Sequence, residues 1–122
     1  MRIVEFSPEG TEPISLYQSI GASSVALGHG SGETHVYCVH FGPGGHIGSH
    51  LTGSCQLFLV VQGSGWAAGS NGVRIPLRAG QGAFFERGEV HSKGSETGML
   101  SIMVQATELE LPSTLQPHSG LA

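Results

Sequence analysis

Two glycine-rich stretches of this 122-residue sequence contain histidine, glutamine and glutamate side chains at spacings that could support chemistry. The first stretch, residues 44–56, reads GGHIGSHLTGSCQ and contains two histidines and a glutamine. The second, residues 80–91, reads GQGAFFERGEVH and ends at His91. Imidazole groups ligate metal ions and transfer protons near neutral pH, and amide or carboxyl groups supply oxygen atoms to such sites. These residue types indicate a site for metal-assisted or acid–base chemistry.

The spacing within the first stretch limits which histidines can act together. On a β-strand alternate side chains share one face, so His46, His50 and Thr52 point the same way. The extended chain places His46 about 13 Å from His50, which is too far for a shared metal ion. His50 must therefore be joined by residues from other strands, and His46 belongs either at the mouth of a cavity or on the surface.

Other familiar catalytic arrangements are missing from the sequence. Aspartate is absent, and no serine stands in a Gly-x-Ser-x-Gly turn, so a nucleophilic triad is not indicated. Glu86 and Glu89 are the acidic residues of the second stretch, and they either supply a carboxylate to the site or lie solvated in a loop. The sequence leaves both alternatives open.

The chain around these stretches has the pattern of short β-strands. Runs rich in β-branched and aromatic residues, bounded by glycine or proline, predict strands at residues 33–41, 56–61, 65–68, 73–77, 83–86 and 99–104. No window keeps apolar residues at helical spacing, so we expect less than a tenth of the chain to be helical. Asn71-Gly72 predicts a tight hairpin turn, and Pro76 places its strand at a sheet edge or beside a bulge.

Composition is typical of a single folded domain. Charged residues make up 11% of the chain and hydrophobic residues 39%, which is too apolar for a disordered segment. The 20 glycines follow no fixed period and suit many tight turns. Many antiparallel strands avoid open edges by closing into a barrel or packing as two sheets. We therefore predict an all-β, antiparallel jelly-roll barrel over residues 1–111 and a loose C-terminal tail over residues 112–122.

Charge and hydropathy exclude several classes of partner. The five basic residues are scattered along the chain, so no nucleic-acid surface is indicated. No apolar run approaches the ~20 residues that cross a bilayer, and no apolar signal core follows the N-terminus, so we expect a cytoplasmic protein without membrane contact. Cys38 and Cys55 form no metal-binding pair and are expected to be small buried thiols.

The two stretches resemble the paired sequence motifs of the cupin superfamily. The first motif, with gaps of five, one, three and six residues, is reproduced by Gly44, His50, Thr52, Gln56 and Gly63. The second motif is reproduced by Gly80, Glu86, Gly88 and His91. Five residues separate Gly80 from Glu86, and two separate Gly88 from His91. The resemblance covers residues 44–95 and implies the cupin fold, an antiparallel double-stranded β-helix.

The resemblance also implies a site inside the barrel. In cupins the first motif supplies two histidines and a glutamate, and the second supplies one histidine, to a divalent metal. Here His50 and His91 stand at histidine positions, whereas Gln56 replaces the glutamate, Thr52 the other histidine, and Glu86 the usual proline. The implied catalytic and metal-ligating set is His50, Gln56 and His91. These neutral ligands suit a weakly held zinc, iron, manganese or nickel ion, or none, and they disfavour iron-dependent oxygenation.

Alternation along the strands predicts which side chains surround this site. We expect the substrate pocket to be lined or filled by Thr52, Phe58, Val60, Phe84, Met99, Ser101 and Met103. His40 belongs either at the surface or at the rim of this pocket.

Two functions fit such a pocket. In the first, the site polarises a small enolisable or carboxylate-bearing substrate while a histidine moves the proton, as in lyase, isomerase or cyclase chemistry. In the alternative, the barrel binds or senses a small ligand without turnover, which the substituted metal positions favour. Cupins commonly pair through their outer strands, so the resemblance also implies a homodimer.

Overall fold

The computed structural model describes residues 1–112, so the predicted tail, apart from Pro112, lies outside the described residues. Strands make up most of this part of the chain. They are β1 (Arg2–Glu5), β2 (Glu12–Pro13), β3 (Ser23–Ser24), β4 (His29–Phe41), β5 (His46–Leu51), β6 (Cys55–Ala68), β7 (Arg74–Arg78), β8 (Gln81–Phe85), β9 (Val90–Gly94) and β10 (Met99–Glu110). The helical segments among the described residues are the short 3-10 turns η1 (Pro8–Gly10) and η2 (Leu16–Gln18). The predicted all-β class is confirmed.

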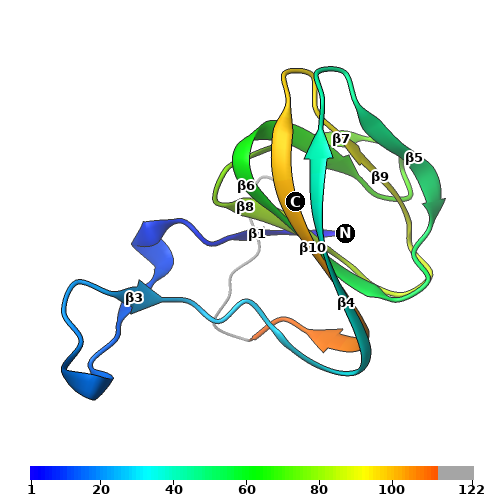
Figure 1. Cartoon of the computed structure of the whole chain (residues 1–122). Helices are drawn as coiled ribbons and strands as arrows, with labels where there is room; N and C mark the ends of the chain where they lie inside the picture. The colour runs from blue at the N-terminus through cyan, green and yellow to red at the C-terminus, as the bar shows by residue number, and fades with distance from the viewer. Residues whose placement is uncertain (113–122) are drawn as a thin grey trace.

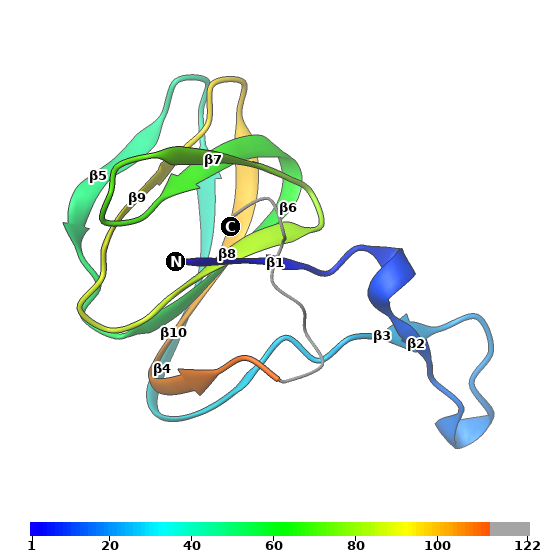
Figure 2. The same ribbon diagram turned by 180° about the vertical axis from the view of Figure 1, so that it is seen from behind.

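The strands form a barrel from two connected antiparallel sheets (Figure 1, Figure 2). One sheet has the order β1-β8-β6-β10-β4. The other contains β5, β9 and β7, with β9 paired to both β5 and β6. The long strand β6 joins the two sheets, because residues 55–63 pair with β10 while residues 64–68 pair with β7. The barrel therefore turns its corner within β6.

Gly63 makes this corner possible. The sequence predicted two separate strands here, whereas the structure has one strand of 14 residues that bends at Gly63. Gly63 has a φ of +78°, and a Cβ at this position would collide with the carbonyl oxygen of Gly98 on the neighbouring segment. The register with β10 shifts between Leu100 and Ser101, beside the same point. A glycine is required because no other residue combines this backbone angle with so close an approach.

The turn between β6 and β7 differs in detail from the predicted tight hairpin. Gly72 has a positive φ of 72°, but Asn71 does not. The N–H of Gly72 donates to the carbonyl of Gly69 at 3.0 Å. The side-chain oxygen of Asn71 accepts from the N–H of Val73 at 3.0 Å, which stabilises a wider turn. Pro76 lies in β7, which pairs with β6 alone among the described strands, so its predicted place at an edge is confirmed.

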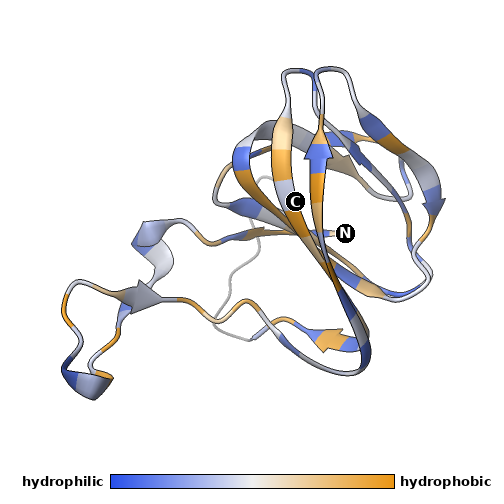
Figure 3. Ribbon diagram, in the orientation of Figure 1, coloured by the Kyte–Doolittle hydropathy of each residue, from blue (hydrophilic) through white to orange (hydrophobic). Residues whose placement is uncertain are grey.

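Two apolar clusters cover opposite faces of the larger sheet. The interior cluster is built from Phe58, Val60, Phe85, Met99, Met103 and their neighbours. The outer cluster contains Val4, Leu57 and Phe84, and residues of the N-terminal segment and of the end of β10 pack against it. Figure 3 shows apolar and polar bands along β4 and β10.

The segment between β1 and β4 leaves the barrel and forms an arm (Figure 1). The short strands β2 and β3 pair within it, and η2 lies near its tip. Leu16, Tyr17 and Ile20 are 64%, 91% and 96% exposed. No helix of residues 1–112 is long and apolar enough to cross a membrane.

Candidate functional site

Strand pairing brings the two predicted histidines together. His50 of β5 lies directly opposite His91 of β9 in the register of these strands. Their Nε2 atoms are 3.2 Å apart, and their ring centroids are 4.5 Å apart. The two motifs therefore meet across one strand pair, although 41 positions separate the residues in sequence.

Gln56 reaches the same place from the other sheet, through a residue that the sequence interpretation missed. Lys93 follows His91 by two positions on β9, so both side chains lie on one face of the strand. The Nζ atom of Lys93 donates a hydrogen bond to Oε1 of Gln56 and lies 3.2 Å from Nδ1 of His91. Lys93 thus joins all three predicted residues into one cluster. In the sequence, its position two residues after His91 indicated that the two side chains share one face of a strand.

The cluster runs from the surface to the centre of the barrel. His50 is exposed, whereas His91 and Lys93 are each 1% exposed and Gln56 is 2% exposed. The ring of Phe85 packs edge-on against His91, with centroids 4.6 Å apart. Lys93 Nζ lies 5.3 Å from the ring centre of Phe58 and 5.2 Å from that of Phe85. These aromatic faces stabilise a buried positive charge, and solvent can reach the cluster at His50.

The hydrogen bonds in the cluster have one consistent direction. Nδ1 of His50 lies 2.7 Å from the carbonyl oxygen of Gly48, which can only accept, so this nitrogen carries the proton. In the neutral ring Nε2 of His50 is then an acceptor, and Nε2 of His91 must donate to it. Nδ1 of His91 is left to accept from Lys93. The result is a chain of hydrogen bonds in which each group donates to the next, from Lys93 through His91 and His50 to Gly48. We call this chain the directed line.

Burial controls the protonation of the two inner groups. Burial, together with the nearby charges of Lys93 and His50, lowers the pKa of His91 to about 3, so its ring is neutral at physiological pH. Burial also lowers the pKa of Lys93 to about 7. Lys93 can therefore gain or lose a proton near neutral pH, which an exposed lysine does not do.

The residues predicted to line a pocket have several different positions. Phe58, Val60, Met99 and Met103 belong to the interior cluster and fill the barrel. Two buried polar groups make bonds to the backbone: the Thr52 hydroxyl donates to the carbonyl of Glu89 at 2.9 Å, and that of Ser101 donates to the carbonyl of Val39 at 3.1 Å.

The expectations for Phe84 and for the two cysteines are wrong. Phe84 does not point inward, because it packs in the outer cluster under the guanidinium of Arg2, 4.9 Å from the ring centre. His40 is at the surface of β4, one of its two expected places, with its Nε2 3.8 Å from the sulfur of Cys38. Cys38 is also exposed and Cys55 is half-buried, so neither is the expected buried thiol. Single-residue alternation could not identify the covered face of β8, because both faces of that strand are buried.

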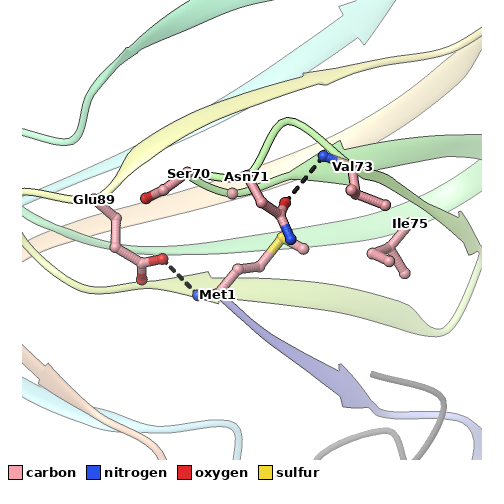
Figure 4. Close-up of a pocket in the computed structure, with 7 residues that line it drawn as sticks. Met1, Ser70, Asn71, Val73, Ile75 and Glu89 are labelled. Carbon is pink, nitrogen blue, oxygen red and sulfur yellow. Dashed lines mark hydrogen bonds and ion pairs between the residues drawn. The ribbon is translucent and has the colours of Figure 1, made fainter. Parts of the chain in front are cut away.

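The two acidic residues of the second stretch, Glu86 and Glu89, lie outside the cluster formed by His50, His91, Lys93 and Gln56. Glu86 is exposed, and its N–H donates to Oε1 of Glu89 at 2.9 Å. The other oxygen of Glu89 pairs with the terminal ammonium of Met1 at 2.5 Å. Figure 4 shows this pair in a separate pocket, beside Ser70, Asn71, Val73 and Ile75. The pocket has a volume of about 360 Å³ and is lined also by Gly69. Neither carboxylate joins the histidines, and His46 is exposed at the far end of β5.

The implied divalent metal does not fit these residues. Residues 1–112 contain no group of three or more histidine, cysteine or glutamate side chains that could hold a metal ion. The amide oxygen of Gln56, the third donor that the resemblance implies, accepts from Lys93 instead. A protonated amine within the donor set also opposes the charge of a second cation.

Comparisons with known proteins find structural neighbours only. A scan of protein-family models finds no match, and a search of curated proteins finds none either. Among solved structures, a cupin-like protein from Thermotoga maritima has a TM-score of 0.58 and 22% identity, with 65% of this chain and 64% of that chain covered. An RmlC-like cupin from Shewanella frigidimarina has a TM-score of 0.58 and 24% identity, covering 62% and 67%.

A third neighbour carries a chemical description. It is a predicted oxalate decarboxylase from Thermotoga maritima, with a TM-score of 0.52 and 25% identity, covering 63% of this chain and 65% of that chain. This chain thus spans about two thirds of the length of each of these three proteins. The topology and its neighbours agree with the paired motifs, and the chain has the barrel fold of these cupin structures.

Proposed function

We propose that this cupin acts on a small enolisable or carboxylate-bearing molecule at His50, with proton transfer carried out by its own side chains. The observation that supports this proposal is the directed line of hydrogen bonds from exposed His50 to buried Lys93. Such a line connects a group that substrate can touch to a group whose charge changes near neutral pH.

The direction of the hydrogen bonds suggests a role for each group. A substrate oxygen replaces Nε2 of His50 as the acceptor of the His91 N–H, which frees that His50 nitrogen to accept a proton. The proton comes from the carbon beside the substrate carbonyl, and its bonding electrons move to the carbonyl oxygen to form an enolate. His91 then stabilises the enolate by hydrogen bonding, and Lys93 strengthens this donor from behind. Return of the proton to a different carbon gives isomerisation, whereas loss of a leaving group gives elimination.

Hydrogen–deuterium exchange tests this proposal without knowledge of the product. A panel of small 2-oxo and 3-oxo acids is incubated with the protein in D2O, and loss of the proton beside the carbonyl is followed by NMR. We expect accelerated exchange for at least one compound and a roughly 10²–10⁴-fold loss in His50→Ala. His46→Ala is the matched control, because His46 is an exposed histidine of the same strand outside the cluster. Equal losses in the two variants would refute the role of His50.

Ligand binding without turnover is the second candidate function. The observation that favours it is that Lys93 and Gln56 bond to each other and leave only His50 exposed to an incoming molecule. Under this alternative, members of the same panel raise the melting temperature but show no exchange. Raised melting temperature with exchange supports the enzyme, and raised melting temperature without exchange supports the binding protein.

A further inference from the structure

We propose that Lys93 excludes a divalent metal from this site and serves as its resident cation. This inference goes beyond the proposed function, because it holds whether or not the bound molecule is turned over. It assigns a role to a residue that neither motif position includes. Two features of the cluster support the exclusion of a metal. Its hydrogen-bond acceptors are already occupied, and the protons of the two histidines have fixed positions.

Lys93 occupies the acceptors that surround it. Its Nζ atom lies within hydrogen-bond distance of Oε1 of Gln56 and Nδ1 of His91. Nε2 of His50 accepts from His91, so each acceptor of the line already has a donor. No buried side-chain nitrogen or oxygen among the described residues lacks a hydrogen-bond partner. A metal would have to displace existing donors rather than enter a vacant set.

Lys93 also opposes the form of His91 that could bind a metal through Nε2. A metal shared by His50 and His91 would use the two Nε2 atoms, which are 3.2 Å apart. The proton of His91 would then have to move to Nδ1, where it would face the N–H groups of Lys93 at 3.2 Å. Two donors would oppose each other in a buried place, which is unfavourable. The lysine therefore disfavours metal binding through the tautomer as well as through its charge.

The buried amine has no evident packing advantage that would explain it otherwise. Lys93 is 1% exposed, and the rings of Phe58 and Phe85 lie beside it. A methionine of similar length would fill this space without the unfavourable transfer of an amine from water. Lys93→Met is therefore a suitable variant for removing the amine while the barrel interior stays filled.

Metal titration tests the inference directly. Ni²⁺ binding is measured at pH 7 by calorimetry for the native protein, Gln56→Glu, Lys93→Met and the double variant. In Gln56→Glu the new carboxylate pairs with Lys93, so we expect little gain in affinity. Lys93→Met should bind at least about tenfold more tightly than the native protein, and the double variant about 100-fold or more, because two histidines and a carboxylate are then free.

Further variants identify the ligands and keep the test decisive. Adding His50→Ala to the double variant should abolish the gain, whereas adding His46→Ala should not. Circular dichroism checks that each variant folds. If the double variant does not fold, the Ni²⁺ affinity of Lys93→Met alone tests whether Lys93 excludes the metal. Native protein that binds one Ni²⁺ within tenfold of the double variant's affinity, or an unchanged affinity in folded Lys93→Met, would overturn the inference. These titrations need no substrate, so their outcome is independent of the exchange experiment.

Discussion

At the scale of single residues, Lys93 combines complete burial with a charge that can change. It is also the only lysine in the sequence. Its hydrogen bonds to Gln56 and His91 and the faces of two phenylalanines offset part of the unfavourable burial of an ammonium group. The part of this unfavourable burial that the contacts do not offset lowers the pKa of Lys93 to about 7. Protein stability should therefore depend on pH through this one residue.

The free energy of unfolding should rise as pH increases above 7. Lys93 has a pKa of about 7 when folded and 10.5 when exposed, so between these values the unfolded chain binds more protons than the folded one. Stability then increases with pH, by on the order of a few kcal/mol across this window. Urea unfolding at pH 6, 7, 8 and 9 measures it. Lys93→Met should remove most of the rise; an equal rise in that variant would show that another group is responsible.

His91 has a second window at lower pH. Its pKa falls from 6.5 to about 3 on folding, so the unfolded chain takes up the extra proton between these values. Stability should fall as pH drops from 6.5 toward 3. Extending the urea unfolding series down to pH 4 measures this decrease, and it is separable from the Lys93 contribution because the two residues titrate in different ranges.

Part of the site could be predicted from the sequence, because motif spacing carries information about which strands meet. His50, Gln56 and His91 do come together. Lys93 was missed because lysine is rarely buried, and composition placed it among five scattered bases. Its spacing from His91 indicated a shared face, but whether that face contacts Gln56 depends on the distance between the two sheets. That distance is set by the packing of the whole interior.

At the scale of elements, β6 and its bend at Gly63 position the site. The N-terminal half of β6 carries Gln56 in the larger sheet, and its C-terminal half pairs with β9, which carries His91 and Lys93. The corner therefore sets how the Gln56 side chain meets the other two. A change at Gly63 should disturb both the fold and the site.

Gly63→Ala should destabilise the protein more than Gly72→Ala. Both glycines have positive φ, so both substitutions introduce backbone strain of about 1–3 kcal/mol. At Gly63 the new methyl group also collides with the Gly98 carbonyl, whereas at Gly72 nothing lies within 4 Å. Denaturant unfolding of the two variants compares the effects. Equal losses would mean that backbone angle alone matters at the corner.

The positions of strands were easier to predict than whether two neighbouring runs form one strand, or which face of a strand each side chain lies on. The runs of β-branched and aromatic residues marked six segments correctly, but glycine at Gly63 was interpreted as a boundary and is instead a bend inside β6. Phe84 was placed on the wrong face because every residue of β8 is buried, so the strand has no polar side to set the direction. Both errors arise where tertiary contacts override the local pattern.

At the scale of the whole molecule, apolar side chains remain exposed on the arm and on the outermost strand. Leu16, Tyr17 and Ile20 project from the arm, and Val36 and Tyr37 of β4 are 65% and 46% exposed. Strand β4 pairs with β10 alone among the described strands. Unpaired edges and apolar patches are typical of association surfaces.

The predicted homodimer remains a prediction, and these surfaces identify variants to test it. Sedimentation at micromolar concentration should give twice the mass of one chain. Replacing Val36 and Tyr17 with serine should shift the population toward monomer, whereas the control Ser19→Ala on the same arm should not. A native protein that sediments as a monomer contradicts the prediction.

The positions of the ring protons on the two histidines test the directed line from Lys93 to Gly48 most directly. Nitrogen-15 NMR of labelled protein at pH 8 distinguishes protonated from unprotonated ring nitrogens. The structure requires His91 to carry its proton on Nε2 and His50 to carry its proton on Nδ1. Lys93→Met should weaken this preference at His91, which His50 still favours, and leave His50 unchanged. A native His91 protonated on Nδ1 would contradict the line of hydrogen bonds, the mechanism derived from it and the role of Lys93.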